Sequence, residues 1–177
     1  MSSPTLASTL TCRLVESDEE LAAHHAVRHQ VFVLDQHLFV ANDRDERDLA
    51  PGTLHAVGID HGGMPLGGIP LGDMSRGDIS PTAVVGAVRL YSLDDRGLWQ
   101  GDRLAVLPHA RVRHLGAQLV RFAVATAGER GGHTMVARIQ LPNVRFFEQL
   151  GWHADGPPGP FHGVTHQPMA IPLGPAR

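Results

Sequence analysis

The residues best suited to chemistry by type and spacing are Arg111, Arg113 and Gly116, which share one short basic turn. The turn follows an apolar, strand-like stretch at residues 99–106, and Leu115 opens a segment with helical apolar spacing. The first N–H groups of a helix have no intrahelical acceptor, and the helix dipole adds partial positive charge there. The turn is therefore predicted to bind a diphosphate, although an ordinary crossover turn explains these residues equally well.

A second segment narrows the interpretation. Residues 134–140 form another apolar, strand-like stretch, followed by Asn143 and by Phe-Phe-Glu-Gln-Leu-Gly-Trp at residues 146–152. The two segments together resemble the GNAT superfamily of acetyl-CoA-dependent acyltransferases. Its pyrophosphate loop, Gln/Arg-x-x-Gly-x-Gly/Ala, matches residues 111–116. Its later asparagine and Phe-Tyr-Glu-x-Leu-Gly-Phe segment match here in the same order, which makes the resemblance more specific than either motif alone.

The loop departs from the family pattern at one position. His114 stands where the family has its middle glycine. A different register, starting at Arg113, would make Gly116 the middle glycine and place Gln118 last. We favour the first register because it puts Leu119 where the helix of the family has its first buried leucine.

The resemblance implies that the strands at residues 99–106 and 134–140 splay apart around the pantetheine arm of the cofactor. Leu104 and Val106 would bind the arm through their backbone, and an N–H near Val106 would stabilise the oxyanion by ~3 kcal/mol. Acetyl-CoA is the expected cosubstrate, with no metal. The residues predicted to bind it are Leu104, Val106, Arg111, Val112, Arg113, His114, Leu115, Gly116, Ala117, Asn143 and Phe147.

The acceptor side is predicted from a second resemblance. Some GNAT-like proteins, and the acyl-homoserine-lactone synthases that share their fold, carry Arg-x-x-Val-Phe-Val-x-Glu-Gln followed by spaced aspartates and a histidine. Residues 28–36 match this pattern, with Asp35 in place of the glutamate. The aspartates and the histidine of the pattern follow as Asp45, Asp48 and His55. The segment is expected to form the acceptor wall, where carboxylates would suit a cationic amine; for the charged stretch at residues 42–48, a solvated loop is the alternative. The residues predicted to bind substrate are Arg28, Phe32, Asp45, Asp48 and Arg89.

Two residues are predicted to be catalytic. An amine with a pKa near ~10.4 must lose a proton before it attacks. Asp102 is the base nearest the expected thioester, although a salt bridge with Arg103 explains it equally well, and Asp45 or Asp48 with His55 are alternatives. Phe147 replaces the usual tyrosine that protonates the leaving thiolate, a tolerable loss because a thiol has a pKa near ~8.5. Tyr91, the only tyrosine, is the predicted substitute.

Composition limits the remaining classes. The chain has 177 residues, a formal net charge of −3 and one cysteine, Cys12. These values indicate one domain without a disulfide framework and give no general attraction to nucleic acid. No apolar run approaches the roughly 20 residues that span a bilayer, and no basic segment precedes an apolar one as in a signal peptide. We therefore expect a cytoplasmic protein with no membrane partner, and a homodimer is left open. His25 and His29 have metal-chelating spacing, but no Glu or Cys partner is evident, so no metal is predicted.

The elements that must position these residues follow from periodicity. Ser17 is a predicted N-cap with Glu20 completing a capping box, and the helix after it runs to Val31. Strands are expected at residues 11–16, 53–59, 83–93, 99–106, 134–140 and 166–173, with Pro168 at an edge or bulge. The main helix should end in the glycine cluster at residues 128–132. This order predicts an α/β (α+β) GNAT-type fold: a mixed, mostly antiparallel twisted sheet flanked by helices, with splayed central strands.

The expected organisation is a flexible tail at residues 1–10 and a single acyltransferase domain at residues 11–173. Residues 61–81, rich in Gly and Pro, are predicted to be a loop insertion unable to sustain helix or sheet, either a plain surface loop or a lid. The predicted function is transfer of acetyl from acetyl-CoA to a small-molecule amine in a ternary complex. Trp-x-Gly-x-Arg-Leu-Ala-Val at residues 99–106, together with Asn-Asp-Arg-Asp at residues 42–45, also resembles GNAT proteins of bacterial nitrilase gene clusters. A non-catalytic CoA-binding scaffold and an acyltransferase like the lactone synthases are the alternatives.

Overall fold

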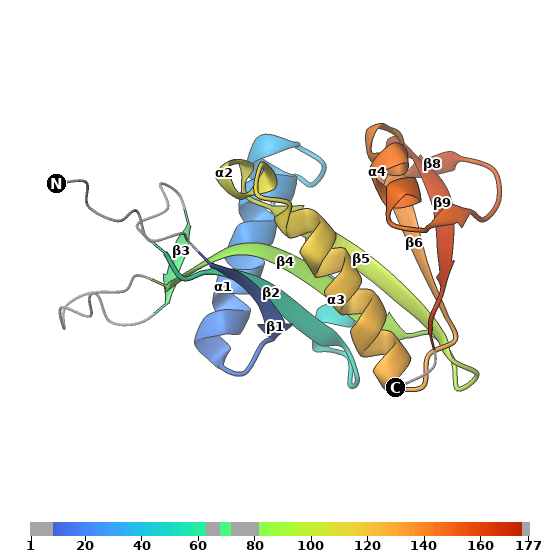
Figure 1. Ribbon diagram of the computed structural model, residues 1–177. Coiled ribbons are helices and arrows are strands. Elements are labelled where there is room, and N and C mark those ends of the chain that lie inside the picture. The colour runs from blue at the N-terminus through green and yellow to red at the C-terminus, as the bar shows by residue number, and fades with distance from the viewer. Residues whose placement is uncertain (1–8, 63–67, 72–81, 175–177) are drawn as a thin grey trace, which may run out of the picture.

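One mixed sheet with helices on both faces forms the protein (Figure 1). The computed structural model describes residues 9–62, 68–71 and 82–174. The strands within them are β1 (Leu10–Leu14), β2 (Leu54–Asp60), β3 (Ile69–Leu71), β4 (Thr82–Ser92), β5 (Leu98–Val106), β6 (Thr134–Gln140), β7 (His153–Ala154), β8 (Gly159–Phe161) and β9 (Val164–Pro172). Their order is β1-β2-β4-β5-β6-β9-β7, with β3 paired to β4 and β8 to β9. Every pairing is antiparallel except β5–β6, which confirms the predicted fold class.

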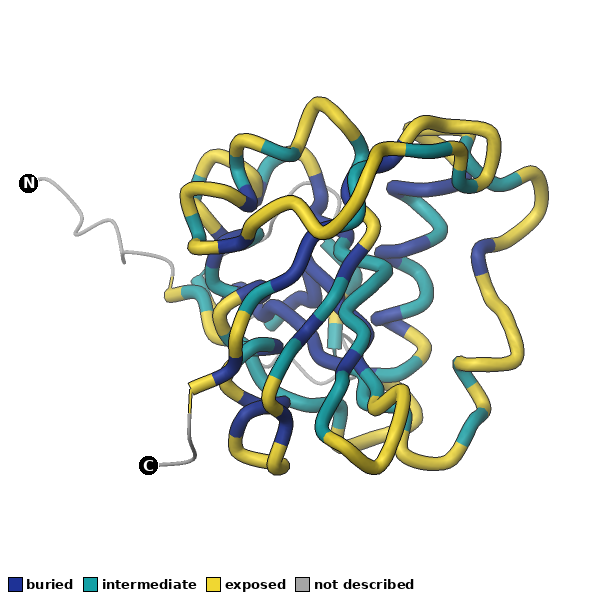
Figure 2. The backbone as a smooth tube through the Cα atoms, turned by 90° about the vertical axis from the view of Figure 1, so that its right-hand side faces the viewer, coloured by how far each residue is buried: buried dark blue, intermediate teal, exposed yellow. Residues whose placement is uncertain are grey.

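Helices cover the two faces of this sheet. They are α1 (Asp18–His29), η1 (Gln30–Asp35), η2 (Glu46–Leu49), α2 (Pro108–Arg111), α3 (Leu115–Glu129), η4 (Leu141–Asn143) and α4 (Val144–Gln149). In Figure 1, α3 lies in front of the sheet and α1 lies behind it, and both contact β4. Buried residues follow the middle of the strands and the inward sides of the helices, while the peripheral turns are exposed (Figure 2).

Two glycines bring α3 close to the sheet. A Cβ at Gly58 or Gly86 would lie 2.8 Å from a side-chain carbon of Leu115 or Leu119, respectively. Both leucines have no exposed surface. Because the two glycines leave this space open, the apolar side of α3 can lie directly on β2 and β4. This packing fixes the start of α3, and with it the basic turn that precedes the helix.

The start of α1 is as predicted in one respect and differs in another. The Ser17 hydroxyl accepts a hydrogen bond of 3.2 Å from the Glu20 N–H, which confirms the N-cap. The Glu20 carboxylate, however, accepts from the Glu16 N–H and from Arg13 instead of closing a capping box on Ser17. The helix continues directly into the wider turns of η1, so the chain stays helical four residues beyond Val31.

The central strands splay as predicted. β5 and β6 pair only from Leu98 to Gln100, opposite Thr134 to Val136, and then diverge (Figure 1). On its other side β5 has a bulge, because the pairing with β4 shifts register between Ala87 and Arg89. Arg103 lies in this bulge with a left-handed φ of 53°. Such bulges bend a strand and redirect its side chains, often beside an active site.

Several local predictions need correction. Ile69–Leu71 pairs with β4 as a short strand, so the predicted insertion does carry sheet; the rest of that loop, residues 63–67 and 72–81, and most of the predicted N-terminal tail lie outside the described residues. Pro168 is at neither an edge nor a bulge: it pairs with Arg138 of β6, and its other side faces the gap between β7 and β8, where no ladder needs its missing N–H. Helix α2 was not predicted. Within the described residues, no helix combines the length and apolar character needed to cross a bilayer.

Candidate active site

A cavity of about 300 Å³ opens where β5 and β6 diverge. Its walls come from β4, β5 and β6, from α3 and α4, from η1 and the loop after it, and from the β8–β9 hairpin. The predicted site residues that line it are Phe32, Tyr91, Asp102, Leu104, Asn143 and Phe147. The cavity therefore joins residues from the predicted acyl-donor side and the predicted acceptor side in one space.

The backbone of β5 presents polar groups to this gap. The Leu107 N–H donates to the Val85 oxygen at 2.9 Å, and Val106 lies opposite Gly86 in the antiparallel ladder. In such a ladder successive residues point alternately toward and away from the partner strand, so the N–H and C=O of Val106 point away from β4. The same alternation places those of Leu104 on that side. The Val106 oxygen accepts a hydrogen bond of 2.9 Å from Arg111 Nε, which leaves its N–H available.

The turn before α3 leaves fewer free donors than predicted. The N–H groups of Arg113 and His114 donate to the oxygens of Ala110 and Arg111, each at 3.2 Å, and so close the turn. The N–H groups that lack a backbone acceptor are those of the first turn of α3, at Leu115, Gly116 and Ala117. The predicted anion site thus narrows to the start of α3.

His114 adopts the left-handed conformation, with φ 61° and ψ 21°. This is a backbone conformation that glycine adopts at little steric cost and other residues adopt rarely. His114 therefore keeps the chain geometry that a glycine at this position would allow.

The two arginines of the turn have different surroundings. Arg113 Nη1 lies 2.5 Å from Oδ2 of Asp60, whose side chain is 6% exposed. The prediction that Arg113 is a free charge for a diphosphate is therefore corrected, because Asp60 already neutralises it. Arg111 contacts only the Val106 oxygen through Nε, so its terminal nitrogens carry no ion pair to a described residue.

Gly116 tests whether the site fits a diphosphate-linked cofactor. A Cβ there would lie 3.6 Å from Cζ of Phe146 and 3.8 Å from Cγ2 of Val106. The missing side chain therefore opens a space between α4 and the end of β5, directly beside the N–H groups that lack acceptors. Asn143 and Phe147 line the adjoining cavity together with Val120 and Ala123 of α3. These features fit a long, flexible arm ending in a diphosphate.

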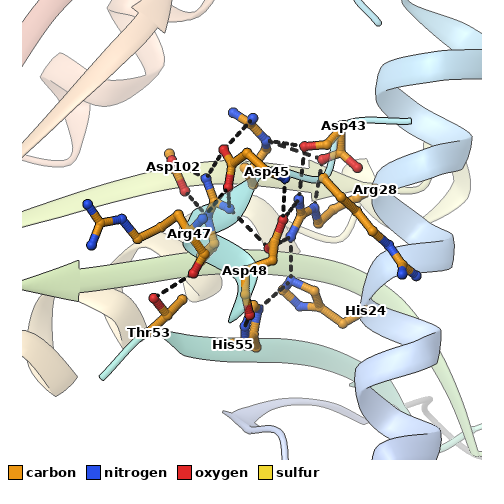
Figure 3. A network of polar contacts seen from close by, with 12 residues as sticks. His24, Arg28, Asp43, Asp45, Arg47, Asp48, Thr53, His55 and Asp102 are labelled. Atoms are coloured by element: carbon orange, nitrogen blue, oxygen red, sulfur yellow. Dashed lines mark hydrogen bonds and ion pairs between the residues drawn. The ribbon is translucent and has the colours of Figure 1, made fainter. Parts of the chain in front are cut away.

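A network of arginines and aspartates joins α1, β4, β5 and the chain around η2 (Figure 3), and its members Asp102 and Arg103 line the cavity. Arg28 Nε is 2.7 Å from Oδ2 of Asp43, and its Nη1 is 2.6 Å from Oδ1 of Asp48. Arg89 Nη1 is 2.6 Å from Oδ1 of Asp45. The Asp48 carboxylate accepts the Asp45 N–H, and the Asp45 carboxylate accepts the Arg47 N–H, so the two residues form a capping box on η2. The loop that carries the aspartates is thus fastened to α1 and β4.

Burial and charge act in opposite directions on Asp48. Burial alone would raise the pKa of this carboxyl. The hydrogen bonds from Arg28 and from the Asp45 N–H outweigh it and hold the pKa of Asp48 well below its usual range. Asp48 is therefore an ionised structural partner and no longer a plausible base.

The substrate-binding predictions separate into two groups. Phe32 lines the cavity, and Asp45 keeps 43% of its side chain exposed. Arg28, Arg89 and Asp48 are 0%, 1% and 3% exposed, and none lines the cavity. For these three the prediction of direct substrate contact is corrected, because their polar atoms are committed to one another inside the protein. The alternative of a solvated loop fits most of residues 42–48, which are exposed, but not the carboxylates of Asp43 and Asp48, which are 2% and 3% exposed.

Arg89 also holds Asp102. Its Nε is 2.7 Å from Oδ1 and its Nη2 is 2.7 Å from Oδ2 of Asp102, a two-point ion pair. The expected alternative partner, Arg103, pairs instead with Asp43 and Asp45. The Tyr91 hydroxyl donates to Oδ2 of Asp102 at 3.3 Å. Burial and the neighbouring Asp102 charge raise the pKa of Tyr91, so its phenol remains protonated.

Three histidines lie together below this network. His24 and His55 are joined through Nε2 and Nδ1 at 3.3 Å, and the ring of His25 lies 5.4 Å from that of His24. Burial and the positive charge of Arg28 lower the pKa of His25 to about 4 and that of His24 well below its ordinary value. His55 does not line the cavity, so the alternative of His55 acting with Asp45 or Asp48 at the reacting atoms is wrong.

Several lining residues escaped the sequence analysis. They are the aromatic and basic side chains Phe39, Arg103, Arg138, Phe161, His162 and His166. His166 is 6% exposed, and its Nδ1 lies 2.8 Å from the Val164 oxygen. A ring nitrogen that faces a carbonyl oxygen donates to it, so in the neutral imidazole Nε2 is the acceptor. For Phe161, His162 and His166 the sequence signal was a concentration of aromatic residues and histidines at residues 153–166, a Pro/Gly-rich stretch that resembles an ordinary loop.

Among the described residues, no group of three or more His, Cys, Asp or Glu side chains is placed to hold a metal ion.

Comparisons with known proteins identify the family and the fold. Residues 17–152 match the model of the acetyltransferase (GNAT) family. Comparison with curated proteins found no match. The structure is similar to Escherichia coli ElaA (20% identity, 93% of this chain and 99% of that chain, TM-score 0.69). It is also similar to an acyl-CoA N-acyltransferase from Pseudomonas aeruginosa (21% identity, 93% and 99%, TM-score 0.67). A third similar structure is BjaI, a CoA-dependent acyl-homoserine lactone synthase, with SAM and isopentyl-CoA (16% identity, 94% and 84%, TM-score 0.65).

Proposed function

Because the chain belongs to the GNAT acetyltransferase family, we propose that it transfers an acetyl group from acetyl-CoA to the amine of a small molecule in a ternary complex. The observation that carries this proposal is the cavity between the diverging strands, which is lined by Val120 and Ala123 of α3 and by Tyr91 with Asp102. The acceptor-free N–H groups lie in the first turn of the same helix, just before Val120. Acetyl-CoA supplies the activated thioester: its C–S bond breaks as the new N–C bond forms, one proton leaves the amine and one reaches the thiolate.

The donor side binds through the backbone. The N–H groups of Leu115, Gly116 and Ala117 would hold the diphosphate, with the positive end of α3 and the terminal nitrogens of Arg111 adding charge. The outward N–H of Val106 is suited to the acyl oxygen. The side chains of Asn143 and Phe147 would line the path of the arm. The left-handed backbone of His114 supports the register in which it replaces the middle glycine.

The proton-transfer roles follow from protonation states. Tyr91 retains its proton and lines the cavity, so we assign it as donor to the departing thiolate, to which its single O–H turns from Asp102. Asp102 is held at both oxygens by Arg89 and is better suited to orienting the Tyr91 hydroxyl than to removing a proton. His166 lines the cavity and its Nδ1 lies against the Val164 oxygen, so we assign Nε2 of the neutral ring as the group that accepts the proton of the amine.

A glycine variant tests the donor side. Gly116→Ala has room for its Cβ and improves helix propensity, so the variant should unfold at an equal or higher temperature. The same Cβ occupies the space beside the free N–H groups, so the affinity for CoA measured by calorimetry should fall by roughly tenfold or more. Arg111→Gln should also weaken binding, with Arg121→Gln, an exposed change on α3, as the matched control. Wild-type protein that shows no heat with CoA or acetyl-CoA refutes the proposal.

Two other functions are separated by turnover. A non-catalytic scaffold would bind acetyl-CoA without releasing CoA in the presence of any amine. Lactone-synthase-like chemistry is the other candidate, because Arg28 and Asp48, two residues of the pattern shared with those enzymes, are joined in one network with Arg89 of β4. S-adenosylmethionine included among the acceptors would reveal it. The chain contains no lysine, so any acetyl-lysine detected in these assays cannot be a residue of this protein.

A further inference from the structure

The acidic wall expected for a cationic amine is already neutralised. Asp43, Asp45 and Asp102 each accept a charge-assisted hydrogen bond or ion pair from Arg28, Arg89 or Arg103. These contacts lie between 2.6 and 3.3 Å, and the three guanidinium groups are 0%, 1% and 8% exposed. A carboxylate bound in this way attracts a further cation only weakly, so acidity does not select the acceptor.

The ionised groups that line the cavity are instead mainly cationic. Among the described residues they are Asp102, Arg103 and Arg138, and Asp102 is paired with the buried Arg89. Arg138 is exposed, and every other residue of β6 is apolar or uncharged. Its guanidinium lies 5.1 Å from the centre of the Phe161 ring and makes no ion pair or hydrogen bond to a described residue. Its donor nitrogens are therefore open to an anion in the cavity.

Aromatic rings surround these cations. Arg103 lies 4.9 Å from the centre of the Phe39 ring. The His162 ring is 4.8 Å from Phe39 and 4.2 Å from Phe161, so the three rings form a row in the cavity wall. Stacking on a ring holds a planar guanidinium in place while leaving its N–H edge available. This part of the cavity wall thus combines flat apolar rings with the positive charge of Arg138, which has no ion pair to a described residue.

We infer that the acceptor is an amine that also carries a carboxylate and an apolar or aromatic group, as a free amino acid does, with Arg138 binding the carboxylate. This inference rests on the proposed acyl transfer and adds the class of substrate. The guanidinium fork matches a carboxylate in two-point geometry, and the rings suit an apolar side chain. Arg138 is a specificity-determining residue here, without a role in the chemical step.

Matched pairs of acceptors test the inference. CoA release from acetyl-CoA is measured with phenylalanine and phenethylamine, leucine and isoamylamine, and methionine and 3-(methylthio)propylamine, so that the members of each pair differ only in the carboxylate. The amino acid should have the higher kcat/KM in at least one pair by about tenfold or more. Arg138→Gln should raise KM for that amino acid by a similar factor and leave its decarboxylated partner unchanged. Arg130→Gln, an exposed change at the end of α3, is the matched control.

The outcomes distinguish this inference from the proposed function. Equal or faster transfer to the decarboxylated amines, or an Arg138→Gln variant that keeps the amino-acid preference, overturns the inference while acyl transfer stands. No CoA release with any amine, including polyamines and aminoglycosides, overturns both. Calorimetric titration of the preferred amino acid into the protein with free CoA gives a reading independent of turnover. Binding there should weaken in Arg138→Gln and remain in Arg130→Gln.

Discussion

The Tyr91 hydroxyl donates a hydrogen bond of 3.3 Å to the Asp102 oxygen that also accepts from Arg89 Nη2 at 2.7 Å. The two residues are diagonal neighbours on adjacent strands, where Tyr91 pairs with Gln100 and Asp102 pairs with Arg89, and both line the cavity. A chain of contacts therefore runs from the buried arginine, through the carboxylate, to a phenol in the cavity. The site is rigid at its base because each member of the chain is held by the next.

Replacing Tyr91 by Phe separates catalysis from stability. The change removes one proton donor and retains the ring, so we expect kcat to fall by roughly 10²-fold with little change in the free energy of unfolding. Steady-state kinetics and a thermal melt measure the two quantities. Unchanged kcat would assign the donor role elsewhere.

Asp102→Asn should behave differently. The substitution removes the negative charge that pairs with Arg89, which is 1% exposed, so the free energy of unfolding should fall by about 2 kcal/mol together with kcat. Urea denaturation of this variant beside Tyr91→Phe makes the comparison. Equal stability of the two variants contradicts the structural role of the ion pair.

The buried histidines predict a loss of stability in mild acid. Burial lowers the pKa of His25 to about 4, whereas in the unfolded chain it is near the ordinary value of 6.5. The unfolded state therefore binds more protons between these values, and stability falls as the pH falls from about 6.5 to 4. Asp48 adds nothing in this window, because its lowered pKa takes effect only below the ordinary aspartate value of 3.8. His25→Gln should flatten the dependence of the unfolding free energy on pH, and His29→Gln is the control.

The left-handed backbone at residue 114 predicts opposite effects of two substitutions. His114→Gly should stabilise the fold by about 1 kcal/mol, because glycine adopts φ 61° without the steric cost of a side chain. His114→Val should destabilise it, since a β-branched residue tolerates this conformation worst. Melting temperatures of the two variants check the prediction, and a higher value for the valine variant would contradict it.

Gly132 is a close-packing position next to the end of α3. A Cβ there would lie 2.6 Å from Leu173 Cδ1 and 2.7 Å from both the Ala127 oxygen and Trp99 Cδ1. Gly132→Ala should therefore cost about 1–3 kcal/mol of unfolding free energy. Gly159→Ala, where no atom lies within 4 Å, should cost much less. Similar losses in both variants would show that chain entropy, and not crowding, dominates.

The sequence by itself determined the order of the main strands and helices, the basic turn before the longest helix, and the family. Apolar periodicity marked β4, β5 and β6 within one or two residues of their ends, because these segments are buried and must alternate or remain apolar. The N-cap at Ser17 was equally predictable, since its hydrogen bond is local. The domain boundaries at residues 11 and 173 stay predictions.

Only the tertiary structure decided which charges are free. An arginine or an aspartate reads the same in the sequence whether its side chain faces a substrate or another residue. Ion pairs between α1, η2 and β4 turned Arg28, Asp48 and Arg89 toward one another. Arg113 was likewise taken by Asp60 of β2, far away in the chain. Arg138, Phe161 and His166 reached the cavity through the pairing of β6, β8 and β9. Such contacts depend on strand register between distant segments, and local sequence patterns do not encode it.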